Sequence, residues 1–183
     1  LKECKFSCSN KWLNYLIDTQ DLIKIFLDNF FKTTKEHEGY IIREIISNLP
    51  TNTDIMIGNS SPIRDLDKFT LENEKLVTIH SNRGVSGIDG IISTAIGISL
   101  DNKSTALIIG DVSFFYDISS LINNLNNNIN LKIFIINNNG GHIFDRLDGL
   151  KVEKNYKNYW LTPVIANIKN AAKLYKCTYT RID

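Results

Sequence analysis

Short apolar runs alternate with helical stretches through most of this chain, and that alternation limits the folds it can adopt. The runs are rich in β-branched residues and lie at residues 55–57, 76–79, 106–109, 131–136 and, more weakly, 177–182. Helices are predicted between them over residues 62–69, 88–100, 116–125 and 164–175. Continuous apolar strands separated by helices are typical of a parallel sheet that is covered on both faces. Right-handed crossovers then predict an α/β fold: a doubly wound parallel sheet of five or six strands with helices on both faces.

The first 37 residues have a different pattern. Apolar side chains recur at helical spacing over residues 12–30, which predicts an amphipathic helix, and a second helix is expected over 40–49, before Pro50. We therefore expect an N-terminal helix and linker over 1–37 and the α/β domain over 38–183. Because the chain begins with Leu1 and shows no basic-then-apolar leader, it is expected to be a piece of a longer protein.

Charge, hydropathy and cysteine content argue against several classes of function. The chain carries 21 basic and 20 acidic residues, a net charge of +1, which argues against binding to nucleic acid or to an anionic membrane surface. No apolar run approaches the length that spans a bilayer. The three cysteines are an odd number without a Cys-x-x-Cys pair, so neither a disulfide framework nor a zinc site is expected. This content fits a reducing compartment, either the cytoplasm or an organelle stroma or matrix.

In a doubly wound sheet, ligands bind beyond the carboxyl ends of the strands. The predicted third strand ends in Gly110-Asp111-Val112-Ser113, and the fourth ends in an Asn-Asn-Asn-Gly-Gly segment at 137–141. A carboxylate, an amide oxygen and a loop carbonyl at this edge could together hold Mg²⁺, which takes its remaining ligands from phosphate and water. The flanking glycines would let the backbone approach a phosphate closely.

Each loop also has an ordinary explanation. An Asp after a strand is most often a helix cap, and Asn-Gly-Gly is most often a turn. A second Asn triplet at 126–128 shows that the triplet is not rare in this chain. The presence of both loops on one sheet edge is therefore what favours a ligand site. A generic nucleotide-binding fold is disfavoured because no Gly-x-Gly-x-x-Gly or lysine-containing phosphate loop follows the first strand.

Four segments resemble a known family. Gly110-Asp111, followed 27 residues after the aspartate by Asn138, resembles the thiamine-diphosphate motif, with Val112 in place of its second glycine. The other segments are GNSSPIRD at 58–65, SNRGVSGIDG at 81–90 and NNGGHIF at 138–144. All resemble the 2-succinyl-5-enolpyruvyl-6-hydroxy-3-cyclohexene-1-carboxylate (SEPHCHC) synthase family of menaquinone and phylloquinone biosynthesis, from about residue 40 to the end of the chain.

The resemblance implies a thiamine-diphosphate-binding fold, of the type that holds the diphosphate end of the cofactor, within a larger C–C bond-forming transferase. That family condenses 2-oxoglutarate with isochorismate and releases CO₂, using thiamine diphosphate with Mg²⁺ or Mn²⁺. Carried onto this chain, Asp111 and Asn138 would bind the metal through their side chains and Gly140 through its carbonyl. The full set of implied cofactor-binding residues is Asn59, Ser60, Ser86, Gly87, Ile88, Gly110, Asp111, Val112, Ser113, Asn138, Gly140, Gly141, Ile143 and Phe144.

The resemblance also assigns residues to the substrates. Arg64 and Arg83 match the family's carboxylate binders, and guanidinium groups suit two dicarboxylate substrates. Ile143, Phe144 and Leu147 would form an apolar wall over the thiazolium side of the cofactor. Ile88 matches the residue that wedges beneath the cofactor, although its position alone indicates only a core residue at the start of a helix. A lone arginine near a helix is ordinarily solvated or salt-bridged, but Arg64 and Arg83 both follow strands on the predicted ligand edge, which favours a functional role.

Some features depart from the family. Asp145-Arg146 replaces a stretch that is usually small and apolar, and His142 is expected to face solvent. The family takes its activating glutamate from a pyrimidine-binding domain, usually of a neighbouring subunit, and this chain has no room for that domain. We therefore expect a homo-oligomer, no catalytic residue in this chain and no turnover by the chain alone. Its own glutamates near the start of the domain, Glu36, Glu38 and Glu44, are expected to face solvent.

Two other functions remain open at this stage. The same cofactor could serve another 2-oxo acid decarboxylase or an acetolactate-synthase-like enzyme, although the arginine pair favours dicarboxylate substrates. Alternatively, the domain could be a catalytically inactive assembly unit. The intact Asp111, Asn138, Arg64 and Arg83 argue against such decay.

Overall fold

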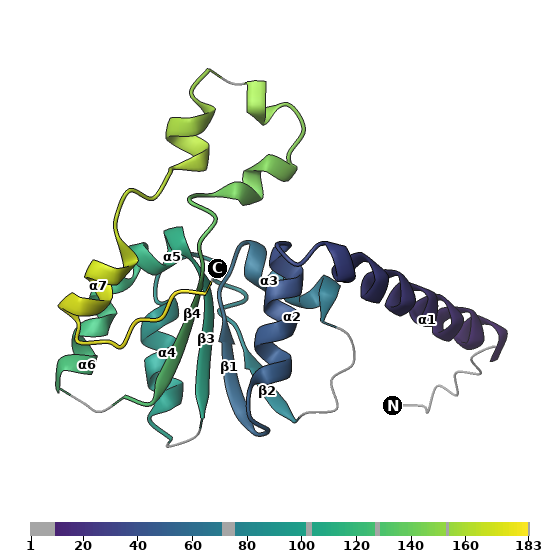
Figure 1. The fold of residues 1–183 in the computed structure, drawn as a ribbon, viewed down its shortest axis with the longest axis horizontal. Coiled ribbons are helices and arrows are strands. Elements are labelled where there is room, and N and C mark those ends of the chain that lie inside the picture. Colours follow the sequence, from purple (N-terminus) through teal and green to yellow (C-terminus); the bar gives the residue numbers. More distant parts are fainter. Residues whose placement is uncertain (1–9, 71–75, 102–103, 127–128, 153, 183) are drawn as a thin grey trace, which may run out of the picture.

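The computed structural model describes residues 10–70, 76–101, 104–126, 129–152 and 154–182. At its centre is a parallel sheet of four strands in the order β2-β1-β3-β4 (Figure 1). The strands are β1 (Thr53–Ile57), β2 (Val77–His80), β3 (Thr105–Gly110) and β4 (Leu131–Ile136). In register, Ile55 of β1 pairs with Ile79 of β2 and Ala106 of β3. β2 and β3 thus lie on opposite sides of β1, which is the reversal of strand order that a doubly wound fold requires.

Helices cover both faces of this sheet, as predicted. The helices are α1 (Asn10–Thr33), α2 (Glu38–Asn48), α3 (Ser61–Phe69), α4 (Ile91–Ser99), α5 (Asp111–Tyr116), α6 (Asn123–Asn126) and α7 (Ile168–Leu174). Short 3₁₀ or π turns are η1 (Ile118–Ile122), η2 (His142–Arg146), η3 (Leu150–Val152) and η4 (Lys157–Leu161). Helices α2 and α3 lie on one face and α4 to α7 on the other (Figure 1).

Alternation along the central strands builds two apolar cores. On β1, Ile55 and Ile57 pack with Ile42 and Ile46 of α2, whereas Met56 packs with α4 on the opposite face. All five residues of β1 are buried, because this strand lies between β2 and β3 and is covered above and below. Continuous burial explains why these strands read as unbroken apolar runs rather than as alternating ones.

The prediction of five or six strands is wrong in number. Residues 177–182 form no strand in the described part of the chain. They follow α7 after a turn in which the Cys177 amide donates to the Ala172 carbonyl. Tyr179 and Ile182 are exposed, so the segment lacks the buried face that stabilises a strand. β4 is accordingly an edge strand here.

Helix boundaries also differ from those predicted. α5 begins at Asp111, directly after β3, so the predicted loop at 110–113 is the first turn of a helix. α4 begins only at Ile91, after Gly90 adopts a φ of 68°, which leaves Ile88 in the preceding irregular segment. The helix predicted over 164–175 shortens to α7 because residues 162–167 are non-helical.

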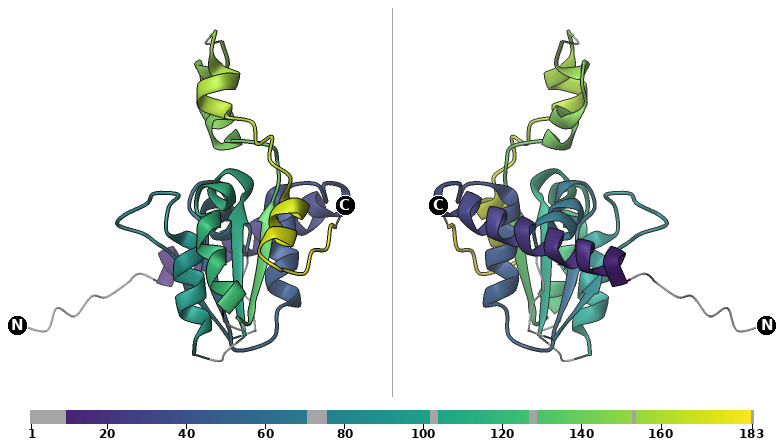
Figure 2. Two further views of the ribbon diagram at one scale, coloured as in Figure 1. Left: turned by 90° about the vertical axis from the view of Figure 1, so that its left-hand side faces the viewer. Right: turned by 90° about the vertical axis from the view of Figure 1, so that its right-hand side faces the viewer.

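Two parts of the chain project from the sheet (Figures 1 and 2). The first is α1, of which only Leu27 and Phe31, near its C-terminal end, are buried. The second, residues 142–161, carries η2 to η4 and stands above the carboxyl edge of the strands; we call it the arm. None of the helices in the described ranges is both long and apolar enough to cross a membrane.

Candidate diphosphate and metal site

The carboxyl ends of β1, β3 and β4 meet around one pocket. It is lined by the start of α2, the turn into α3, the β3–α5 junction and the loop after β4. The lining residues are Glu38, Ser60, Ser61, Pro62, Gly110, Asp111, Val112, Ser113, Ile136, Asn138, Gly140, Gly141, His142 and Ile143. The pocket therefore lies where ligands bind in open parallel sheets.

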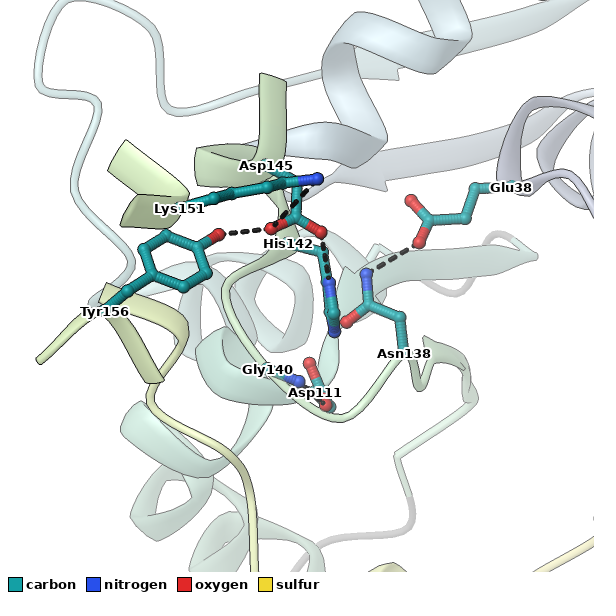
Figure 3. Close-up of polar contacts among 8 residues, drawn as sticks. All are labelled: Glu38, Asp111, Asn138, Gly140, His142, Asp145, Lys151 and Tyr156. Carbon is teal, nitrogen blue, oxygen red and sulfur yellow. Dashed lines mark hydrogen bonds and ion pairs between the residues drawn. The ribbon is translucent and has the colours of Figure 1, made fainter. Parts of the chain in front are cut away.

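Asp111 is a buried carboxylate at the floor of this pocket. Its Oδ2 accepts a hydrogen bond from the Gly140 amide at 2.9 Å (Figure 3). Its Oδ1 accepts a hydrogen bond from the Val112 amide at 2.8 Å. Burial raises the pKa of Asp111, and hydrogen bonds from the backbone amides partly offset that rise. No ion pair to this carboxylate is present among the described residues, so its charge is balanced only by amide dipoles. Such a group favours a bound cation.

Asn138 places an amide oxygen beside this carboxylate. Its Nδ2 donates to Glu38 Oε1 at 2.6 Å, while its Oδ1 is buried and has no hydrogen-bond partner in the described structure (Figure 3). The expectation that Glu38 faces solvent is therefore wrong: it is half-buried and lines the pocket. The contact joins residues 100 positions apart, which explains why no local sequence signal could reveal it.

The loop between Asn138 and the arm requires glycine. Gly140 has a φ of 142°, and a Cβ at this position would lie 2.5 Å from the Leu161 carbonyl oxygen. Asn139 before it is in the left-handed region, with a φ of 66°. The Gly141 amide donates to that same Leu161 oxygen at 2.6 Å, so the loop and the end of the arm are held together. This close packing turns the loop backbone toward Asp111.

The turn after β1 supplies the opposite wall. Ser60 has a φ of 74°, a conformation that side chains rarely adopt. Asn59 beneath it is buried; its Nδ2 donates to the Gly87 carbonyl at 2.7 Å, and its Oδ1 has no described partner. Arg64 curls back so that its Nη1 donates to the Ser60 carbonyl at 2.7 Å. The guanidinium is exposed and lies next to the pocket wall.

The pocket brings together only part of the predicted cofactor set. Nine of those residues line it: Ser60, Gly110, Asp111, Val112, Ser113, Asn138, Gly140, Gly141 and Ile143. Asn59 lies below the wall, and its bond to Gly87 ties the turn after β1 to the segment that holds Ser86 and Ile88. These last residues do not line the pocket, and neither does Phe144.

The predicted substrate residues are more dispersed. Arg64, Arg83 and Leu147 are exposed. Ile143 lines the pocket, whereas Phe144 makes an edge-to-face contact with Trp160 inside the arm, with ring centroids 5.3 Å apart. Of the predicted substrate residues, only Ile143 lines the pocket.

The arm is organised around Asp145, one of the departures from the family. Its carboxylate accepts hydrogen bonds from the Tyr156 hydroxyl and from His142 Nδ1, the latter at 2.8 Å, and pairs with Lys151 at 3.9 Å (Figure 3). The hydrogen bonds from His142 and Tyr156 lower the pKa of Asp145, and Asp145 raises the pKa of Tyr156 to about 12. Sequence reasoning missed this cluster because its members are spread over residues 142–156. The prediction that His142 faces solvent is wrong, since it is half-buried and lines the pocket.

Arg146, the second departure, anchors the arm to the main body. Its Nη2 bonds to Asp65 Oδ1 at 3.1 Å, and the Asp65 side chain is fully buried. Asp65 belongs to α3, so this ion pair links the arm to the helix that follows β1. The two departures therefore make polar contacts, Asp145 within the arm and Arg146 between the arm and α3.

The donor set at the pocket suits a hard divalent cation bridged to a polyanion. The buried Asp111 carboxylate and the unpartnered Asn138 Oδ1 are oxygen donors, and the Gly140 backbone is held close by its bond to Asp111. No group of three or more His, Cys, Asp or Glu side chains in the described ranges could hold a metal. A cation here would depend on phosphate and water for its other ligands, as Mg²⁺ commonly does.

Comparison with known proteins defines the class. The sequence model described as "Thiamine pyrophosphate enzyme, C-terminal TPP binding domain" matches residues 66–183, and the chain belongs to this family. In structure, it is similar to benzoylformate decarboxylase from Polynucleobacter necessarius, with a TM-score of 0.60 and 16% identity over 76% of this chain and 27% of that chain. At that identity the likeness concerns the fold alone.

Among proteins of this class, the chain is similar to 2-succinyl-5-enolpyruvyl-6-hydroxy-3-cyclohexene-1-carboxylate synthases. It is 34% identical to that of Lysinibacillus sphaericus strain C3-41 over 174 residues, which are 93% of this chain and 30% of that protein. It is also 34% identical to that of Bacillus cytotoxicus over 174 residues, 95% of this chain and 30% of that protein. The chain thus spans about 30% of the length of these relatives.

Proposed function

We propose that this domain binds the diphosphate of thiamine diphosphate through a divalent cation, as one part of a SEPHCHC synthase. The observation that carries the proposal is the buried Asp111 carboxylate beside the unpartnered oxygen of Asn138, at the edge of the sheet where ligands bind. The membership of the chain in the TPP-binding family supports the identity of the cofactor. When bound, thiamine diphosphate supplies the electron sink for loss of CO₂ from a 2-oxo acid.

The residues of this chain bind and orient that cofactor. Asp111 and Asn138 would hold Mg²⁺ or Mn²⁺ through side-chain oxygens and Gly140 through its carbonyl. Asp111 balances the cation in a low-dielectric setting, where a charge pair is stronger than in water. The remaining coordination positions would be left to diphosphate oxygens and water, so the cation would allow a domain with a net charge of +1 to hold a polyanion.

The substrate pair is the finer part of the proposal. Arg64 and Arg83 lie after β1 and β2, on the ligand-binding edge of the sheet. Two exposed guanidinium groups suit substrates that carry two carboxylates each, such as 2-oxoglutarate and isochorismate. The similarity of the chain to proteins named 2-succinyl-5-enolpyruvyl-6-hydroxy-3-cyclohexene-1-carboxylate synthase supports this proposal. A pyrimidine-binding domain, contributed by a neighbouring subunit of a homo-oligomer, would complete the active site.

Calorimetric titration tests cofactor binding. The chain should bind thiamine diphosphate only when Mg²⁺ or Mn²⁺ is present, and EDTA should reverse that binding. Asp111→Ala should abolish metal-dependent binding, whereas Asp67→Ala, at an exposed position on α3, should leave it unchanged. Equal affinity with and without metal, or an unchanged Asp111→Ala variant, would contradict the proposal.

The substrate assignment needs a protein that carries the missing length. In such a protein, 2-oxoglutarate should be the preferred donor over pyruvate, and Arg64→Ala should raise the KM for 2-oxoglutarate more than that for pyruvate. A preference for pyruvate would favour an acetolactate-synthase-like enzyme instead. Cofactor binding without turnover of either donor would favour an inactive assembly domain. The isolated chain is expected to show no turnover.

A further inference from the structure

Glu38 belongs to α2, at the start of the domain, yet its side chain reaches the pocket formed at the ends of β3 and β4 (Figure 3). We propose that Glu38 is a positioning residue that orients the Asn138 amide so that its oxygen, and not its nitrogen, faces the cation. This inference rests on the proposed function. Glu38 also lies before residue 66, where the match to the TPP-binding family begins.

An asparagine side chain can present either of two ends to a cation. An amide has one oxygen that can bind a cation and one NH₂ group that repels it, and the two have nearly the same shape. A free side chain could rotate by half a turn about its last bond and present the wrong end. A carboxylate beside one end removes this ambiguity, since it accepts from NH₂ and repels the carbonyl oxygen.

The structure places such a carboxylate on one side of Asn138 only. The Asn138 Nδ2 lies 2.6 Å from Glu38 Oε1, a short distance typical of a hydrogen bond to an ionised group. The Oδ1 atom at the other end is buried, and no described donor reaches it. A buried acceptor without a partner is unfavourable, and a cation in the pocket would satisfy it.

Glu38 is itself held in place by its two neighbours in sequence. His37 caps α2, with its Nδ1 accepting from the Gly39 amide at 3.0 Å. Gly39 is buried against α3, so closely that a Cβ there would overlap the Phe69 ring. The His37 ring in turn contacts Phe69, with centroids 4.9 Å apart. The first turn of α2 is therefore anchored, and Glu38 has little freedom to leave Asn138.

Metal affinity tests this role in the whole chain. With thiamine diphosphate present, the binding of Mn²⁺ can be measured from the electron paramagnetic resonance signal of the free ion. Glu38→Ala should weaken Mn²⁺ binding about tenfold or more, as loss of a residue that orients a metal ligand commonly does. Glu38→Gln can present either an acceptor oxygen or a donor NH₂ to Asn138, so its Mn²⁺ affinity should fall between those of wild type and Glu38→Ala. Glu44→Ala, on the exposed face of the same helix, is the matched control.

A second background separates orientation from direct ligation. In Asn138→Asp, both ends of the side chain are oxygens, so nothing needs to be oriented. Glu38→Ala should then cause no loss of Mn²⁺ affinity. If Glu38 were itself a metal ligand, its removal would weaken binding in both backgrounds, and the inference would be overturned.

The contact can also be followed without any ligand. The side-chain NH₂ signal of Asn138 in a nitrogen–proton correlation spectrum should be displaced in wild type, and should return to the free-amide position in Glu38→Ala. An unchanged signal in Glu38→Ala would overturn the inference. So would wild-type Mn²⁺ affinity in that variant, although the proposed function would then stand. Absence of Mn²⁺ binding by the wild-type chain would instead refute the proposed function, and the inference with it.

Discussion

Substitution of Gly140 by alanine tests whether the packing of the arm shapes the pocket. Two structural features determine how much stability the Gly140→Ala variant should lose. A φ of 142° is a conformation in which a side chain is strained, at about 1–3 kcal/mol. The added Cβ would also lie 2.5 Å from the Leu161 carbonyl oxygen, a backbone atom that cannot move alone. Relief of such an overlap typically costs about 1–3 kcal/mol.

The arm gives the chain a way to relieve that overlap. Because residues 142–161 stand apart from the sheet, we expect the arm to lift from the loop before the core unfolds (Figures 1 and 2). Lifting would break the 2.6 Å bond from the Gly141 amide to the Leu161 carbonyl. The main effect of Gly140→Ala should therefore be faster hydrogen exchange at Gly141, with a smaller loss in the free energy of global unfolding.

Two other glycines calibrate the measurement. Gly149 also has a positive φ, of 84°, but a Cβ there would meet nothing within 4 Å, so Gly149→Ala should cost only about 1 kcal/mol of strain. Gly97 lies within α4 with an ordinary φ and open space, so Gly97→Ala should stabilise the chain by about 0.5–1 kcal/mol. Urea unfolding and amide exchange should be compared across the three variants. Equal exchange rates at Gly141 in Gly140→Ala and Gly149→Ala would refute the reasoning.

Three further predictions concern charged and titrating groups. Arg146→Ala should lower the free energy of unfolding, measured by denaturant titration, by about 1–3 kcal/mol because it leaves the buried Asp65 carboxylate unpaired. Asp65→Asn in the same chain should recover part of this loss, and no recovery would contradict a stabilising role for the ion pair. The hydrogen bond to Asp145 raises the pKa of Tyr156 from 10.0 to about 12, so the stability that this contact contributes should be complete below about pH 10 and lost as the pH rises to about 12. Absorbance at 295 nm reports the ionisation of tyrosine, and Tyr156→Phe should flatten this part of the stability profile. Burial raises the pKa of the Cys177 thiol, so this thiol should react with a disulfide reagent more slowly in the folded chain than in urea, and equal rates would contradict its placement.

The sequence pattern predicted the layers of the fold well but not its edges. The apolar runs at 55–57 and 106–109 are confirmed as strands, and their burial on both faces explains the continuous local signature. The runs at 76–79 and 131–136 are confirmed as the less buried outer strands β2 and β4. The weaker run at 177–182 forms no strand, since pairing with a sheet edge is not a local property. Helix boundaries shifted where one residue, such as Gly90 with its positive φ, decides where the first turn begins.

The candidate site, like the fold, was only partly predictable from the sequence. The positions of Asp111 and Asn138 after neighbouring parallel strands predicted a shared edge, and the pocket found there contains both. Their roles as ligands stay predictions.

Apolar periodicity, composition and the order of helices and strands along the chain are local properties of the sequence, and they were sufficient to predict the carboxyl edge of the sheet and the loops that reach it. Only tertiary packing decided which side chains complete that edge. Glu38 and Asn138 are separated by 100 positions, and Asp65 and Arg146 by 81. Such contacts depend on how α2, α3 and the arm pack around the sheet, and no residue spacing encodes the distance between two atoms brought together in this way.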